Sequence, residues 1–122
     1  MAKIKGVLID VGTNKAEART LSGELSGYYR ALCCDTITVA YRKIGGKPFL
    51  IICDDEGLLK DYNLPSAVDS DNRVQLVGNL FVVQDNPKNG EFCSLTDEEC
   101  QYVLDHVARL ADGTPIITKC DY

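Results

Sequence analysis

The stretch that decides the fold is QLVGNLFVVQDNPKNGEFCSLTDEE, residues 75–99. An apolar, β-branched run from Val74 to Gln84 predicts a buried strand, with Gly78 as a bulge or a site of close backbone approach. A polar, turn-rich loop follows this strand. Thr96-Asp97-Glu98-Glu99 then forms a Thr-x-x-Glu capping box, which predicts a helix that starts at Thr96.

The helix that starts at Thr96 is expected to be the longer of two helices. Apolar residues follow the capping box at helical spacing, and Asp112-Gly113 with Pro115 is typical of a helix end. The apolar positions are Cys100, Val103, Leu104, Val107, Leu110 and Ala111. A shorter helix is predicted from Ser22 to Leu32, where Gly23 and Gly27 lower the helical propensity.

Two β-hairpins are predicted upstream, because β-branched and aromatic runs flank short turns rich in glycine and asparagine. The paired segments are Lys3–Asp10 with Lys15–Arg19, and Thr36–Ile44 with Pro48–Cys53. Residues 54–73 predict a loop, and residues 115–118 predict a final short strand. The expected fold class is α+β, with an antiparallel, hairpin-based sheet packed by one long C-terminal helix and one short N-terminal helix in a single compact domain, 1–122.

Length and composition indicate one small domain in the cytoplasm. The chain has 122 residues, 45% of them apolar, which suffices for one core. The longest apolar runs are only as long as a strand, and no secretory leader pattern precedes the first strand. The six cysteines lack a secretory context, so we expect reduced thiols. They form no Cys-x-x-Cys motif, so we expect no structural metal.

The charge of the chain argues against one large class of partners. A net charge of -5 and a pI near 4.7 argue against a duplex nucleic-acid partner, because such binding depends on a basic stripe. A small phosphate-bearing molecule remains compatible with this charge, because one or two arginines and backbone N–H groups can hold a pyrophosphate.

No motif indicates catalysis or a cofactor. His106 is the only histidine, and no Ser or Cys motif points to it as a base. The phosphate-loop and dinucleotide-binding fingerprints are absent. The acidic groups at 54–56 and 97–99 suit acid–base work, but turn and helix N-terminal acids are the more common explanation. We therefore expect a protein that is not an enzyme and has no cofactor.

Several residues suit a ligand surface but also have ordinary structural interpretations. Arg109 falls on the solvent side of the expected helix, where an i,i+4 pair with Asp105 is the more common explanation. Arg30 fits a solvated cation near a helix end, and Phe81 fits a core position. The candidates in the polar loop are turn residues of ordinary type, Asn86 and Asn89.

The order of strand, polar loop and capping box carries a family resemblance. The segments VGNLFVV (77–83), GEFCSLTDEE (90–99) and IICDDEG (51–57) resemble a family of small phage, plasmid and gut-bacterial proteins filed as a domain of unknown function. Within it, the chain is similar to phage anti-Thoeris sponge proteins. Those proteins capture cyclic ADP-ribose signals of bacterial immunity without cleaving them, and some relatives also bind cyclic di- or trinucleotides at separate sites.

The resemblance implies a function and a site. It implies an anti-defence binder in the host bacterial cytoplasm, a homo-oligomer with its ligand pocket at a subunit interface. The pocket residues that it implies are Phe81 for stacking, Asn89 or Asn86 for an amide contact, and Arg30 and Arg109 for the pyrophosphate. The alternative function is that of an acidic mobile-element protein that inhibits a host protein by direct binding.

Overall fold

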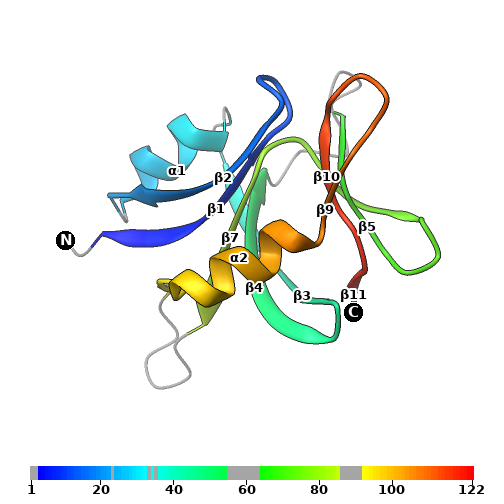
Figure 1. Ribbon diagram of the computed structural model, residues 1–122. Helices are drawn as coiled ribbons and strands as arrows, with labels where there is room; N and C mark the ends of the chain where they lie inside the picture. The colour runs from blue at the N-terminus through cyan, green and yellow to red at the C-terminus, as the bar shows by residue number, and fades with distance from the viewer. Residues whose placement is uncertain (1–2, 23, 33, 35, 55–63, 86–91) are drawn as a thin grey trace.

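In the part of the chain that a computed structural model describes, the protein is mostly β, with two sheets and two short helices (Figure 1). The structure describes residues 3–22, 24–32, 34, 36–54, 64–85 and 92–122. The expected α+β fold, with a long C-terminal helix packed on one sheet, is therefore wrong. Strand pairing near the C-terminus replaces much of that helix, and residues 65–68 of the expected loop form a strand of a second sheet.

The larger sheet, sheet A, contains seven strands in the order β11-β3-β4-β7-β1-β2, with β8 paired to β7. Its strands are β1 (Ile4–Asp10), β2 (Lys15–Leu21), β3 (Ile37–Ile44), β4 (Lys47–Asp54), β7 (Leu80–Asp85), β8 (Phe92–Cys93) and β11 (Cys120–Asp121). Both predicted hairpins are confirmed, because β1 pairs antiparallel with β2 and β3 with β4. Gly45 and Gly46 have φ values of 61° and 88° in the β3–β4 turn, a conformation that glycine adopts without strain.

The smaller sheet, sheet B, has the order β6-β5-β10-β9. Its strands are β5 (Pro65–Val68), β6 (Val74–Val77), β9 (Val107–Arg109) and β10 (Pro115–Ile117). The single strand expected from Val74 to Gln84 is two strands in different sheets, since Gly78, at φ 77°, turns the chain between them. The loop expected over 54–73 contains β5, whereas residues 55–63 lie outside the described part of the chain.

Helix α2 (Asp97–Asp105) starts as predicted and ends early. Thr96 is its N-cap and shares a reciprocal capping box with Glu99: the Glu99 N–H donates to Thr96 Oγ1 over 3.1 Å, and the Thr96 N–H donates to Glu99 Oε1 over 3.0 Å. The helix was expected to continue to Ala111, but the chain leaves it at His106 and forms β9 instead. Strand pairing between β9 and β10 therefore overrides the helical periodicity of residues 107–111.

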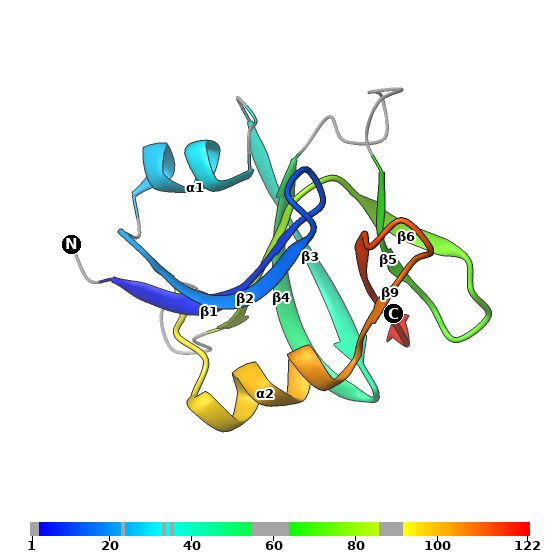
Figure 2. The ribbon, with the colours of Figure 1, turned by 45° about the horizontal axis from the view of Figure 1, so that its top comes forward.

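The core lies on both faces of sheet A, so the central strand β4 is buried along most of its length. On one face α2 and sheet B cover a cluster that includes Ile9, Ile51 and Val82. On the other face the short helix α1 (Leu25–Leu32) covers a cluster with Tyr28 and Phe81. Figure 2 shows the β1–β2 hairpin running between α1 on one side and α2 on the other.

Candidate functional site

The candidate site is built at the end of the molecule where the β1–β2 turn meets the β9–β10 turn. Arg109, the last residue of β9, is exposed, and its Nη1 donates hydrogen bonds to the carbonyl oxygens of Asn14 and Gly113, the latter over 3.1 Å. Asn14 Nδ2 donates to the Asp112 carbonyl over 3.3 Å. One guanidinium therefore joins two turns that lie far apart in the sequence.

Helix α1 is connected to the same turn by one buried amide. Asn79 is only 8% exposed; its Oδ1 accepts the N–H of Val11 over 3.0 Å, and its Nδ2 donates to the Ala31 carbonyl over 3.3 Å. Asp10 shapes the turn further, because its carboxylate accepts the N–H groups of Gly12 and Thr13. In Figure 1 the tip of the β1–β2 hairpin lies between α1 and the β9–β10 turn.

The two predicted arginines lie on different elements, each of which is connected to the β1–β2 turn by hydrogen bonds. Arg30 is exposed in the last turn of α1, whose residues Tyr28 and Leu32 are buried against sheet A. Arg109 was expected on a helix, with Asp105 as its alternative partner. It lies instead on a strand, and the Asp105 carboxylate accepts a hydrogen bond from Gln101 over 2.8 Å.

Phe81 lies in the core rather than on a surface. It is fully buried in β7, with its ring centroid 6.2 Å from that of Tyr28. Gly6 lies beside this ring, since a Cβ at position 6 would come within 2.9 Å of Phe81 Cζ. In this conformation Phe81 supports α1 and offers no exposed ring face for stacking. The other two predicted residues, Asn86 and Asn89, lie outside the described residues, so their role stays a prediction.

Most acidic side chains of α2 have structural partners. Asp97 forms an ion pair with Lys5, which lowers the pKa of Asp97 and raises that of Lys5 through their hydrogen bond. Burial alone would raise the pKa of Glu99, but hydrogen bonds from Thr96 and Gln84 hold it below its ordinary value. Glu99 therefore caps the helix, and Asp97 connects the first turn of α2 to β1.

His106 also has a structural role, because its ring packs against Tyr102. Its Nδ1 lies 2.8 Å from the carbonyl oxygen of Tyr102, and the two ring centroids are 4.6 Å apart. The Tyr102 hydroxyl donates to the carbonyl oxygens of Ile44 and Gly45. Tyr102 and His106 therefore hold the end of α2 against the β3–β4 turn. Within the described ranges no three His, Cys, Asp or Glu side chains gather closely enough to hold a metal ion.

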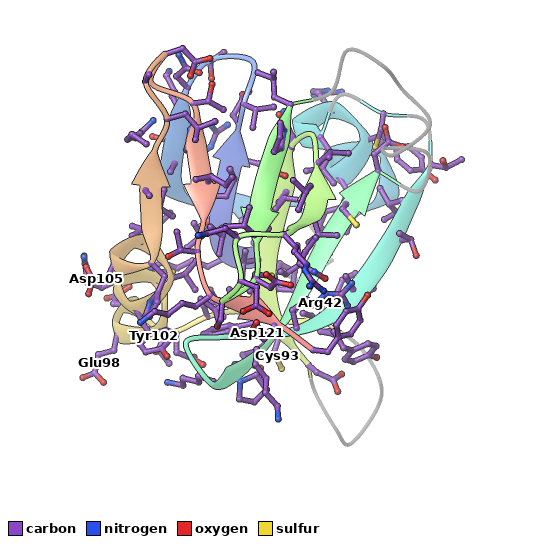
Figure 3. All side chains as sticks on the ribbon, turned by 90° about the vertical axis from the view of Figure 1, so that its right-hand side faces the viewer. Arg42, Cys93, Glu98, Tyr102, Asp105 and Asp121 are labelled. Carbon is purple, nitrogen blue, oxygen red and sulfur yellow. The ribbon has the colours of Figure 1, made fainter. Side chains whose placement is uncertain are left out.

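A carboxylate connects the two sheets at the end of the chain. Asp121 in β11 accepts hydrogen bonds from the Ser70 hydroxyl over 2.6 Å and from the Ser70 N–H over 2.9 Å, which lowers the pKa of Asp121. Figure 3 labels Asp121 in this region. Beside it in sequence, burial raises the pKa of the Cys120 thiol to about 11. The thiol is therefore protonated at neutral pH and packs as a small apolar group.

Sequence reasoning missed Asn79 and Asn14. Asn79 is a polar residue inside an apolar run. A buried amide in such a run requires hydrogen-bond partners, and this requirement could have identified Asn79 from the sequence. Asn14 has a φ of 58°, a left-handed conformation that asparagine tolerates better than most residues. Neither signal identifies the distant partners Ala31 and Arg109, which depend on the fold.

These features define a small two-sheet β protein in which Arg109 connects two turns at one end by hydrogen bonds. The chain belongs to the family described as Domain of unknown function (DUF3846), whose model matches residues 4–108. Neither the curated proteins nor the solved structures contain a match to this chain. Among the described residues, no helix is long and apolar enough to cross a membrane.

Proposed function

We propose that this protein binds a cyclic ADP-ribose-type signalling nucleotide without cleaving it, and so acts as an anti-defence sponge. The observation that carries the proposal is Arg109. It is exposed and its side chain is held by two backbone carbonyls, so the cation is oriented before a ligand arrives. A pre-oriented guanidinium loses less side-chain entropy when it pairs with a phosphate than a free one does.

The proposal assigns a second cation to the ligand besides Arg109. Arg30 adds a second exposed cation on α1, the helix that Asn79 connects to the same turn. Two charge-assisted contacts to a pyrophosphate, at about 1.5–3 kcal/mol each, would supply a large part of micromolar affinity. The buried ring of Phe81 receives no ligand contact in this proposal. The amide contact stays assigned to Asn86 or Asn89.

The test is a calorimetric titration of the protein with isomers of cyclic ADP-ribose. Arg109→Ala should weaken binding by about tenfold to a hundredfold, the loss of one charge-assisted contact. Arg73→Ala is the matched control, because Arg73 is also an exposed arginine but lies in the β5–β6 turn of sheet B. Equal loss in both variants, or none in Arg109→Ala, would reject the assignment. Circular dichroism of each variant checks that the fold is retained.

The second candidate, an inhibitor that binds a host protein, is favoured by the outer side of α2. Glu98 and Asp105 are exposed there, and Figure 3 shows both side chains pointing away from the rest of the protein. Such a surface suits a basic partner. Replacing both residues with lysine would abolish capture of a basic host protein and leave nucleotide binding unchanged. Arg109→Ala should have the opposite effect, so the two variants together separate the two functions.

A further inference from the structure

Strand β2 is the long open edge of sheet A. It has seven residues and is the last strand in the order of the described sheet. The other edge strands of the two described sheets are shorter, with two residues each in β8 and β11, four in β6 and three in β9. Short edges are protected from pairing with other chains, whereas a seven-residue edge presents a row of backbone donors and acceptors.

The side chains of β2 alternate in charge on one face. Glu17 and Arg19 lie on the α1 side, as shown by the pairing of Glu17 with Leu8, and they form an ion pair over 3.1 Å. Ala18 lies on the opposite face, and it is small and exposed. Charges on an edge strand usually discourage pairing. Here their alternating sign makes the strand complementary to itself.

We propose that two copies of this chain dimerise by antiparallel pairing of β2 with β2, with Ala18 on the two-fold axis. In antiparallel strands, residues that face one another point to the same side of the sheet, so a symmetric pair is centred on one residue. Centring on Ala18 places Glu17 of each copy opposite the partner's Arg19. Two complementary charge pairs then cross the seam.

The neighbouring registers are disfavoured by the same charges. Centring on Glu17 places two glutamates face to face and Lys15 opposite the partner's Arg19, while centring on Arg19 places two arginines face to face. Like charges that are directly opposite destabilise a strand pair. Of the registers centred on Glu17, Ala18 and Arg19, only the Ala18 register sets opposite charges across the seam, and the joined sheet carries both α1 helices on the same side. This inference does not depend on nucleotide binding.

The test is the oligomeric state of the full chain without ligand, measured by sedimentation. We expect a dimer in the wild type. Glu17→Arg and Arg19→Glu should each weaken dimerisation, roughly tenfold to a hundredfold, because each turns two attractive pairs into two repulsive ones. The double exchange Glu17→Arg/Arg19→Glu restores opposite charges across the seam and should restore the dimer. A monomeric wild type, or a dimer that none of these exchanges weakens, would overturn the proposal.

Cross-linking locates the axis independently of charge. Cysteine at position 18 would face itself across the seam, so Ala18→Cys should give a covalent dimer under mild oxidation. Lys15→Cys is the control, because residue 15 would face the partner's Leu21 in this register. Because both variants retain the native cysteines, a covalent dimer specific to Ala18→Cys supports the register. Equal cross-linking in both would contradict it.

Discussion

Gly6→Ala tests the packing of sheet A at its centre. A Cβ at position 6 would lie 2.3 Å from the Val82 carbonyl oxygen and 2.9 Å from Phe81 Cζ, both closer than the 3.0 Å that real Cβ atoms keep. The nearer atom belongs to the backbone of β7, which is paired on both sides, to β1 and to β4. Strand β7 therefore cannot move away without opening one of those ladders.

The expected cost follows from this geometry. Overpacking a rigid core costs about 1–3 kcal/mol, and a backbone clash between paired strands belongs at the upper end of that range. A loss of about 3 kcal/mol would lower the Tm of a domain of this size by roughly 10 °C. Urea denaturation followed by circular dichroism measures the change as a lower midpoint with an unchanged slope.

Gly12→Ala is the matched control for Gly6→Ala. A Cβ at position 12 would meet only Asp10 Oδ1, at 3.4 Å, which is an ordinary contact. The control should be neutral or stabilise the protein by up to about 1 kcal/mol, because alanine restricts the unfolded chain. If Gly6→Ala is as stable as Gly12→Ala, the close approach of β1 and β7, and with it the described position of Phe81, is wrong.

Three further changes test other contacts. Asn79→Ala leaves the buried Val11 N–H without its partner and should lower the free energy of unfolding by about 1–3 kcal/mol. A loss below about 0.5 kcal/mol in urea melts would contradict the role of Asn79 in connecting α1 to the β1–β2 turn. Thr96→Ala removes the α2 cap and should cost about 1 kcal/mol, while Thr96→Ser should be nearly neutral in the same assay. The lowered pKa of Asp121 means that its contact stabilises the fold above the ordinary pKa of 3.8 and is lost as pH falls through the folded value. The stability difference between wild type and Ser70→Ala should therefore shrink as pH falls below about 4, and a pH-independent difference would refute that linkage.

The local elements near turns and caps were predictable from sequence. Gly45-Gly46 between two β-branched runs located the β3–β4 hairpin, and Thr96 with Glu99 located the start of α2. In each case a local interaction determines the structure, because a positive φ or a capping hydrogen bond depends on a few neighbouring residues.

The end of α2 could not be predicted from local signals. Asp112-Gly113 is typical of both a helix end and a hairpin turn, and in this fold it lies in the turn between β9 and β10, with Gly113 at φ 92°. Pairing of residues 107–109 with residues 115–117 favours the hairpin turn over the helix end, and this pairing cannot be read from local sequence signals. Because the helix ends before residue 109, the prediction that Arg109 lies on a helix is wrong, although its exposure was predicted correctly.

The candidate site was predictable only in part for the same reason. Arg30 and Arg109 were selected by resemblance. In the structure, Asn79 connects the helix of Arg30 to the β1–β2 turn, and the Asn14 carbonyl in that turn accepts a hydrogen bond from Arg109. Those contacts join segments that are distant in sequence. The burial of Phe81 also depends on the fold, since an aromatic residue in an apolar strand fits either face of a sheet that is covered on both sides.

The most direct test of the proposed function asks whether the nucleotide is retained and returned unchanged. The protein is incubated with less than one equivalent of cyclic ADP-ribose and passed through a membrane that retains protein, and the retained fraction is heated and analysed by mass spectrometry. The proposal predicts that most of the nucleotide stays with the protein and is released intact. Nucleotide that passes freely into the filtrate, or that is recovered as a cleaved product, would contradict it.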